Sequence, residues 1–292
     1  MNILDTIGNT PLIKAQHIID NPNVDLYLKL EGHNPAGSVK DRAALNMIKS
    51  AMDRGDIKSN TKIVEATSGN TGIALAMIAG FYNITIELVM PENATPERIK
   101  TMKAYGAIVT LTSKSKGIEG SRDYAENLSK KKGYLILNQF ANDDNWKAHY
   151  KTTGPEIWRD SEGKISHFIS SMGTTGTIMG TSTYLKEQNT KIKIVGVQPT
   201  ENSNIPGIRK WSKSYLPKIF DSRKVDQIIN VSENEAIKMA QQLALKEGVF
   251  AGMSSGGAVA AALKLAENLE NGVLVVIICD RGDRYLSSNL FN

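Results

Sequence analysis

The sequence of 292 residues contains a single cysteine, Cys279, and only four histidines. One cysteine excludes an internal disulfide framework and any zinc site built from several cysteines, and it predicts a reducing compartment. The histidines, His17, His33, His149 and His167, are scattered along the chain without the spacing of metal ligands. We therefore expect no metal site.

Long apolar runs are also missing. No stretch reaches the ~20 apolar residues that a membrane-spanning helix needs, and no basic region precedes an apolar segment at the N-terminus. The net charge is +5, but lysine and arginine alternate with acidic residues, as in Lys49–Lys58, and no nucleic-acid-binding motif accompanies them. These absences favour a cytoplasmic enzyme that acts on small molecules, with no membrane or nucleic-acid partner.

Strand-like and helix-like segments alternate along most of the chain. Short apolar runs such as Ile63–Ala66 and Val273–Ile278 predict buried strands, and segments such as 73–80 predict helices between them. This alternation predicts a parallel α/β sheet with helices on both faces. The alternation is interrupted after a predicted strand at Leu135–Leu137, where we interpret residues 138–150 as a polar loop at a domain junction.

The segment Asn34–Arg42 joins an apolar strand to a helix through a turn that contains Gly37 and ends at Ser38, a residue type that caps helices. Lys40 then falls in the first helical turn, where unpaired N–H groups and the positive end of the helix dipole disfavour its protonated form. A neutral lysine can attack an aldehyde. Taken alone, the pattern also fits a solvated lysine beside Asp41.

Three turns rich in small polar residues each follow a predicted strand and precede a predicted helix: Thr67–Gly72, Gly173–Thr177 and Gly252–Gly257. Such turns offer N–H groups and hydroxyls to an anion at a helix N-terminus. Gly173–Thr177 lacks the ending of a P-loop and the spacing of a dinucleotide fingerprint, so a small phosphate monoester remains. In open α/β sheets these turns meet at one edge. A phosphate, a carboxylate and a reactive amine together indicate pyridoxal phosphate and an amino acid.

The ordered motifs resemble the cysteine synthase family of fold-type-II pyridoxal-phosphate enzymes along nearly the whole chain, and within it the B-type branch. The resemblance implies a fold like that of the tryptophan synthase β subunit, with two open, twisted, mostly parallel sheets flanked by helices. It implies a smaller mobile domain at 35–144, which carries the Thr67–Thr71 substrate loop, and a larger domain at 145–292 plus 1–34, which carries the phosphate loop. A homodimer is also implied. The segments that match the family are Ile7–Leu12, Asn34–Arg42, Glu65–Gly72, Gln139–Phe140, Thr152–Glu156, Gly173–Thr177, Gly252–Gly257 and Arg281–Ser287. Those that match the B-type branch are Ile205–Arg209 and Cys279–Tyr285.

The resemblance also implies a role for each matching residue. Lys40 carries pyridoxal phosphate and moves the substrate α-proton, Asn70 binds the ring hydroxyl of the cofactor, and Ser254 faces its ring nitrogen. The cofactor phosphate is bound by Gly173, Thr174, Thr175, Gly176 and Thr177. The substrate carboxylate is bound by Thr67, Ser68, Gly69, Thr71 and Gln139, and the pocket is bordered by Arg209, Lys210 and Cys279.

The implied reaction is formation of L-cysteine from O-acetyl-L-serine and sulfide, together with S-sulfocysteine from thiosulfate. A neutral Ser254 at the ring nitrogen favours loss of a β-leaving group over transamination. Lys210 stands where the B-type pattern commonly has arginine, which leaves the sulfur donor open. The alternatives are a serine or threonine dehydratase, a cystathionine β-synthase, and a non-catalytic paralogue that binds a partner enzyme.

Overall fold

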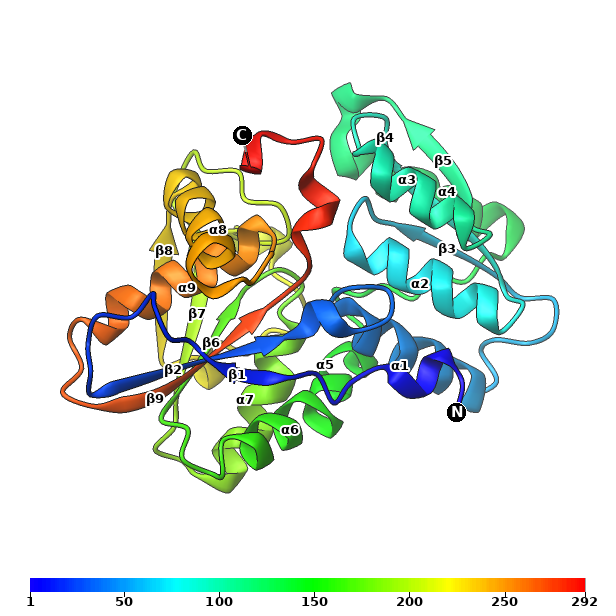
Figure 1. Cartoon of the computed structure of the whole chain (residues 1–292). Helices are drawn as coiled ribbons and strands as arrows, with labels where there is room; N and C mark the ends of the chain where they lie inside the picture. The colour runs from blue at the N-terminus through cyan, green and yellow to red at the C-terminus, as the bar shows by residue number, and fades with distance from the viewer. Residues whose placement is uncertain (292) are drawn as a thin grey trace.

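The computed structural model describes residues 1–291, which form two lobes that lie side by side (Figure 1). One lobe contains a six-stranded sheet and the other a three-stranded sheet. Both sheets are mainly parallel and are flanked by helices, so the predicted α/β class with two open sheets is confirmed.

The larger sheet has the strand order β1-β2-β9-β6-β7-β8. Only β1 and β2 pair in antiparallel fashion, and the other neighbours are parallel. In β9 the apolar run is continuous because alternate residues enter two different cores: Leu274 and Val276 on one face, Val275 and Ile277 on the other. The strands are β1 (Leu12–Lys14), β2 (Val24–Leu30), β6 (His167–Ser171), β7 (Lys193–Pro199), β8 (Gln227–Val231) and β9 (Gly272–Ile278).

Helices cover both faces of this sheet (Figure 1). One face packs against α8 (Glu233–Glu247) and α9 (Met253–Ala266), and the other against α6 (Thr153–Asp160) and α7 (Gly176–Gln188). Helix α5 (Asp143–Lys151) packs beside α7 and also against α1 of the other lobe. It therefore lies where the two lobes meet.

The smaller lobe is built on β3 (Lys62–Ala66), β4 (Thr85–Pro91) and β5 (Ile108–Thr112), which are parallel. Helix α2 is apolar around most of its circumference and buried, because α1 and α3 pack on it and β4 lies behind it. Helix α4 covers the opposite face of the sheet. The helices are α1 (Lys40–Asp53), α2 (Asn70–Phe81), α3 (Pro96–Ala104) and α4 (Gly117–Lys132). Short 3-10 helices in the chain lie at Ile3–Thr6, Glu31–His33, Lys114–Lys116, Lys213–Tyr215, Ser222–Lys224, Gly282–Tyr285 and Asn289–Phe291.

Several predicted details are wrong. Residues 138–150 are not only a loop, because α5 occupies Asp143–Lys151. Leu135–Leu137 does not form a strand: Leu135 makes one isolated bridge to Ile63. The edge strand β8 was not expected. Helix α1 begins at Lys40, and Ser38 supports that start by accepting a hydrogen bond from the Lys40 amide at 3.2 Å.

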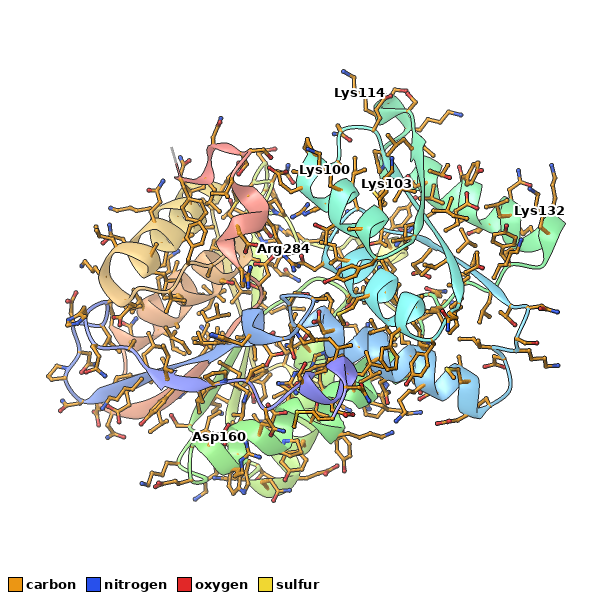
Figure 2. All side chains as sticks on the ribbon, turned by 45° about the vertical axis from the view of Figure 1, so that its right-hand side comes forward. Lys100, Lys103, Lys114, Lys132, Asp160 and Arg284 are labelled. Carbon is orange, nitrogen blue, oxygen red and sulfur yellow. The ribbon has the colours of Figure 1, made fainter. Side chains whose placement is uncertain are left out.

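The lysines of the smaller lobe are spread over its outer surface. Figure 2 shows Lys114 and Lys132 at different ends of this lobe, whereas Arg284 lies between the lobes. Arg284 donates to the side-chain oxygen of Asn70 at 2.6 Å and to the carbonyl of Ala36, so it links the C-terminal segment to both loops that lead into α1 and α2. In the described part of the chain, every helix is too short or too polar to cross a bilayer.

Candidate active site

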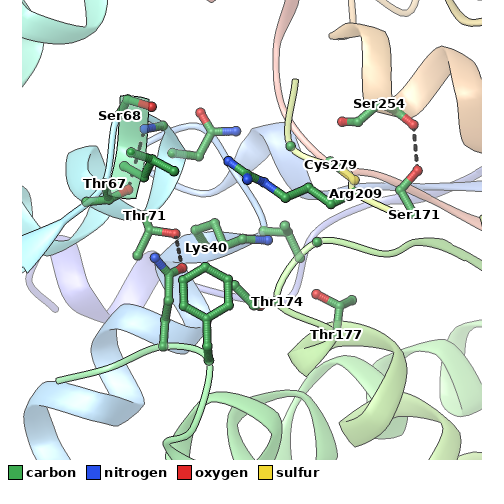
Figure 3. Close-up of a pocket in the computed structure, with 18 of the residues that line it drawn as sticks. Lys40, Thr67, Ser68, Thr71, Ser171, Thr174, Thr177, Arg209, Ser254 and Cys279 are labelled. Atoms are coloured by element: carbon green, nitrogen blue, oxygen red, sulfur yellow. Dashed lines mark hydrogen bonds between the residues drawn. The ribbon is translucent and has the colours of Figure 1, made fainter. Parts of the chain in front are cut away.

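A cavity of about 170 Å³ lies between the lobes, where the segments that follow β3, β6 and β9 meet (Figure 3). The fold thus brings together turns that are far apart in the sequence. The predicted residues that line this cavity are Lys40, Thr67, Ser68, Gly69, Asn70, Thr71, Gln139, Gly173, Thr174, Thr177, Arg209, Ser254 and Cys279. Thr175, Gly176 and Lys210 do not line it.

Lys40 reaches into the middle of this set of residues (Figure 3). The backbone just before it is fixed to the other lobe, because the amide of Val39 donates to the carbonyl of Cys279 at 2.9 Å. Within residues 1–291 the Lys40 ammonium has neither an ion pair nor a hydrogen-bond partner. Burial lowers the pKa of Lys40, and the nearby Cys279 and Asp280 oppose this effect without cancelling it. Lys40 is therefore an amine without a partner whose pKa is lower than that of an ordinary lysine.

The turn between β6 and α7 forms a tight cradle at a helix N-terminus. A side chain at Gly173 would collide with the carbonyl of Gly207, and one at Gly176 would collide with Asn145. Thr175 adopts a left-handed conformation with φ of 70°, and its buried hydroxyl has no hydrogen-bond partner in the described chain. Such a cradle, with an orphaned hydroxyl and bare backbone, fits a phosphate group.

Two side chains that the sequence did not single out hold this cradle. His149 contacts the hydroxyl of Thr177 at 3.3 Å and that of Thr153 at 2.8 Å. Burial lowers the pKa of His149 to about 3, with a further contribution from Arg42, so the ring is neutral. Trp211 donates its indole N–H to the carbonyl of Gly173 at 2.8 Å. His149 and Trp211 thus each contact the turn directly, one through a side-chain hydroxyl and the other through a backbone carbonyl.

The Thr67–Thr71 loop enters α2 on the opposite side of the cavity. Thr71 donates its hydroxyl to the side-chain oxygen of Gln139 at 2.7 Å, which leaves the Gln139 amide N–H groups free to donate. The Glu65 carboxylate in turn accepts from the amides of Asn138 and Gln139 at 3.2 and 3.5 Å. Burial raises the pKa of Glu65 to about 7, against the effect of these hydrogen bonds. This side of the cavity offers donors suited to a carboxylate.

Asn70, at the start of α2, is fixed by two partners. Its side-chain N–H group donates to Asp280 at 2.6 Å, while its oxygen accepts from Arg284 at 2.6 Å. Tyr285 donates to the same Asp280 oxygen at 2.7 Å. The orientation of the Asn70 amide is therefore determined by the C-terminal segment.

Ser254 and Cys279 line the side of the cavity that belongs to the larger lobe (Figure 3). Ser254 lies in the first turn of α9, and its carbonyl accepts from the Ser171 hydroxyl at 2.8 Å. Burial raises the pKa of Cys279 to about 11, even though Lys40 acts in the opposite direction. Cys279 is thus a neutral thiol rather than a nucleophilic thiolate.

Arg209 and Lys210 have different positions despite being adjacent. Arg209 lines the cavity, whereas Lys210 forms an ion pair with Glu201 at 3.0 Å and lines a larger outer cleft. Arg122 of α4, which the sequence did not single out, lines both spaces. No cluster of three or more potential metal ligands occurs within residues 1–291.

Comparison with known proteins identifies the family of the chain and relatives that match nearly its whole length. The family profile described as "Pyridoxal-phosphate dependent enzyme" matches residues 3–280. The chain is 56% identical over 290 residues to cysteine synthase B of Pseudomonas aeruginosa, which covers 99% of this chain and 97% of that protein. It is 53% identical over 286 residues to cysteine synthase B of Escherichia coli strain K12, covering 98% and 94%.

Solved structures of similar proteins also match the chain over nearly its whole length. The structure of a cysteine synthase from Entamoeba histolytica superimposes with a TM-score of 0.95 at 37% identity and covers 99% of this chain and 90% of that chain. An O-ureido-L-serine synthase superimposes with a TM-score of 0.94 at 36% identity, covering 99% and 94%. The likeness therefore extends over the whole of both lobes.

Proposed function

Because the chain belongs to the family of pyridoxal-phosphate dependent enzymes, we infer that its cavity forms L-cysteine from O-acetyl-L-serine. The observation that carries this proposal is the partnerless Lys40 amine in the same cavity as Gly173, Thr174 and Thr177 of the cradle. The cofactor fits these residues, because the turn has no room for side chains at its glycines and leaves the Thr175 hydroxyl unsatisfied. When bound, pyridoxal phosphate supplies a conjugated ring that accepts electron density from the substrate α-carbon.

We assign the anchoring roles to residues on both lobes. Lys40 is the residue that bonds to the cofactor aldehyde, and the N-terminus of α7 with Thr174, Thr175 and Thr177 binds the phosphate. The Thr67–Thr71 loop, together with the free Gln139 N–H groups, orients the substrate carboxylate on the opposite side. Substrate is thereby held from both lobes, which fixes the α-carbon near Lys40.

The remaining steps follow from the chemistry of the amine. Lys40 would be freed from the cofactor aldehyde when the substrate amino group takes its place, and its amine would then take the α-proton. The lowered pKa of Lys40 favours this step because the step requires the neutral amine. The bond between the β-carbon and the acetate oxygen breaks, and acetate leaves with the electron pair. The sulfur nucleophile then bonds to the β-carbon, and Lys40 returns a proton to the α-carbon. O-acetylserine and hydrosulfide thus give cysteine and acetate.

Borohydride reduction of the holoenzyme followed by peptide mapping tests the role of Lys40. We expect the cofactor on Lys40 alone, and Lys40→Ala should abolish cysteine formation. Lys49→Ala, which removes an exposed lysine from the same helix, is the matched control and should retain activity. A tag on any other lysine would show that the assignment is wrong.

We further propose that thiosulfate is accepted as well as sulfide and gives S-sulfocysteine. The support is Arg209, which lines the cavity and suits an oxyanion better than a lysine does. Arg209→Ala should lower kcat/KM for thiosulfate roughly tenfold or more, since one charge-assisted hydrogen bond contributes about 1.5–3 kcal/mol. Turnover with sulfide should fall much less. Equal losses with both donors would contradict this role.

The proposal extends to the assembly and its location. The family resemblance supports a homodimer in the cytoplasm, and the single free cysteine suits a reducing compartment. Sedimentation of the purified holoenzyme tests the assembly, and a monomer at working concentration would rule out the dimer.

A further inference from the structure

Four side chains form a continuous row at the mouth of the cavity. The guanidinium of Arg122 lies 4.5 Å from the centre of the Phe140 ring, and Phe140 meets Trp211 edge to face with ring centres 5.5 Å apart. The guanidinium of Arg209 lies 5.5 Å from the Trp211 ring at the other end. We call this set the entrance row. It begins on α4 of the smaller lobe and ends on the 205–211 segment of the larger lobe.

The entrance row separates two spaces. Arg122, Arg209 and Trp211 line the inner cavity that contains Lys40, and they also line an outer cleft of about 710 Å³. The remaining wall of this cleft comes mainly from residues 199–212. A solute that travels from the outer cleft to Lys40 therefore passes along the entrance row, which carries an arginine at each end.

The charges of these arginines are not neutralised. Neither Arg122 nor Arg209 has an ion pair within residues 1–291, whereas the neighbouring Lys210 is paired with Glu201 at 3.0 Å. Burial raises the pKa of Glu65, and the positive charge of Arg122 opposes this through space. The Glu65 carboxylate, however, already accepts hydrogen bonds from backbone amides. A guanidinium that stacks on a ring keeps its N–H groups available at its edge. Two such cations at one opening match a small dianion.

We propose that Arg122, acting opposite Arg209, is a specificity residue that admits a doubly charged sulfur nucleophile such as thiosulfate into the cavity. This inference rests on the proposed function, because the nucleophile then attacks the β-carbon through its outer sulfur while acetate leaves. The three oxygens of the sulfonate end take no part in this bond and accept hydrogen bonds from the arginines, and one of the two negative charges leaves with acetate. Sulfide has no such oxygens and passes without their help.

Steady-state kinetics of the holoenzyme with each donor test the proposal. We expect Arg122→Ala to lower kcat/KM for thiosulfate roughly 10- to 100-fold, since it removes a charge-assisted contact, and to lower that for sulfide by less than about threefold. Arg122→Lys should be intermediate, because it keeps the charge but loses the planar fork. Lys130→Ala, which removes an exposed cation from the same helix, is the matched control and should behave as the parent. Arg122→Gln replaces Arg122→Ala if the latter does not fold.

Binding of thiosulfate without O-acetylserine gives a second readout. Trp211 lies in the entrance row, so its fluorescence should change on titration with thiosulfate, and Trp211→Phe should remove that change. Arg122→Ala should weaken the apparent Kd roughly tenfold or more. Equal losses with both donors, or an unchanged Kd, would overturn the proposal. If the parent makes no cysteine from sulfide, the proposed function fails, and the titration alone then decides the role of Arg122.

Discussion

Arg42 offers a stringent test of how helix α1 is held, because it lies only two residues after Lys40. Its guanidinium donates to both oxygens of Glu31, at 2.7 and 2.8 Å, and to both oxygens of Glu156, at 2.6 and 2.7 Å. Lys29 pairs with Glu156 at 2.8 Å. The four side chains are at most 7% exposed and carry two positive and two negative charges. These four charges cancel and are buried, and the partly exposed Asp160 lies at the edge of the cluster, 3.3 Å from Lys29.

Arg42→Met keeps the bulk of the side chain but leaves two buried carboxylates facing one ammonium. Removing one partner of a buried ion pair costs about 3–5 kcal/mol, because the remaining charge is uncompensated. In a protein of 292 residues that loss corresponds to a fall in Tm of roughly 5–8 °C. Arg54→Ala on the same helix is the control: that arginine is 50% exposed, so its ion pair should contribute less than about 1 kcal/mol.

Urea and thermal unfolding of the two variants and the parent measure these differences. Adding Glu31→Gln to Arg42→Met should recover part of the lost stability, because it removes the uncompensated charge. A loss in Arg42→Met no larger than that in Arg54→Ala would refute the reasoning. So would a double variant that is less stable than Arg42→Met alone.

Three further predictions concern Glu156 of the same cluster, Gly176 of the cradle and the 67–71 loop. Burial opposes ionisation of Glu156, but Arg42 and Lys29 lower its pKa to about 2, below the ordinary 4.5. Its stabilising effect, about 3 kcal/mol, should be complete above pH ~5 and lost as the pH falls from about 4.5 to 2, which urea titrations at pH 7, 5 and 3 measure. Gly176→Ala should weaken cofactor binding roughly tenfold or more, since the new methyl group has no room, and absorbance titration with pyridoxal phosphate measures this. Structures with and without bound amino acid should show the 67–71 loop moving toward Gly176 as domain 35–144 closes, and an unchanged separation would exclude closure.

The sequence predicted the structure best in segments whose conformation depends on their own residues, such as buried strands and glycine turns. Buried parallel strands such as Ile63–Ala66 and Val273–Ile278 are short apolar runs, and the structure has strands at Lys62–Ala66 and Gly272–Ile278. The turn Gly173–Thr177 was recognisable because glycine is required where backbone passes close to backbone. In these segments the local pattern and the fold agree.

It was least informative where polar groups are buried. Helix α5 was missed because its inward face carries Asp144, Asn145 and His149, so no apolar periodicity marks it. These side chains are satisfied by partners from other segments: Asn145 donates to the Thr174 hydroxyl at 3.1 Å, and Asp144 pairs with Arg54 at 2.7 Å. Burial of such groups depends on tertiary partners that no local window contains.

The same limit applies to the contrast between Lys40, which we propose to be reactive, and Lys29. Lys29 and Lys40 lie in neighbouring segments, and Lys29 is the more deeply buried of the two. Lys29, however, donates to the carbonyl of Thr10 at 2.7 Å and pairs with Glu156 and Asp160, so its ammonium is fully occupied. Lys40 has no such partners, and burial lowers its pKa because the nearby acidic groups only partly oppose this effect. The reactivity that we propose for Lys40 thus depends on its lack of partners. That lack cannot be predicted from the local sequence, because it depends on how the two lobes are arranged.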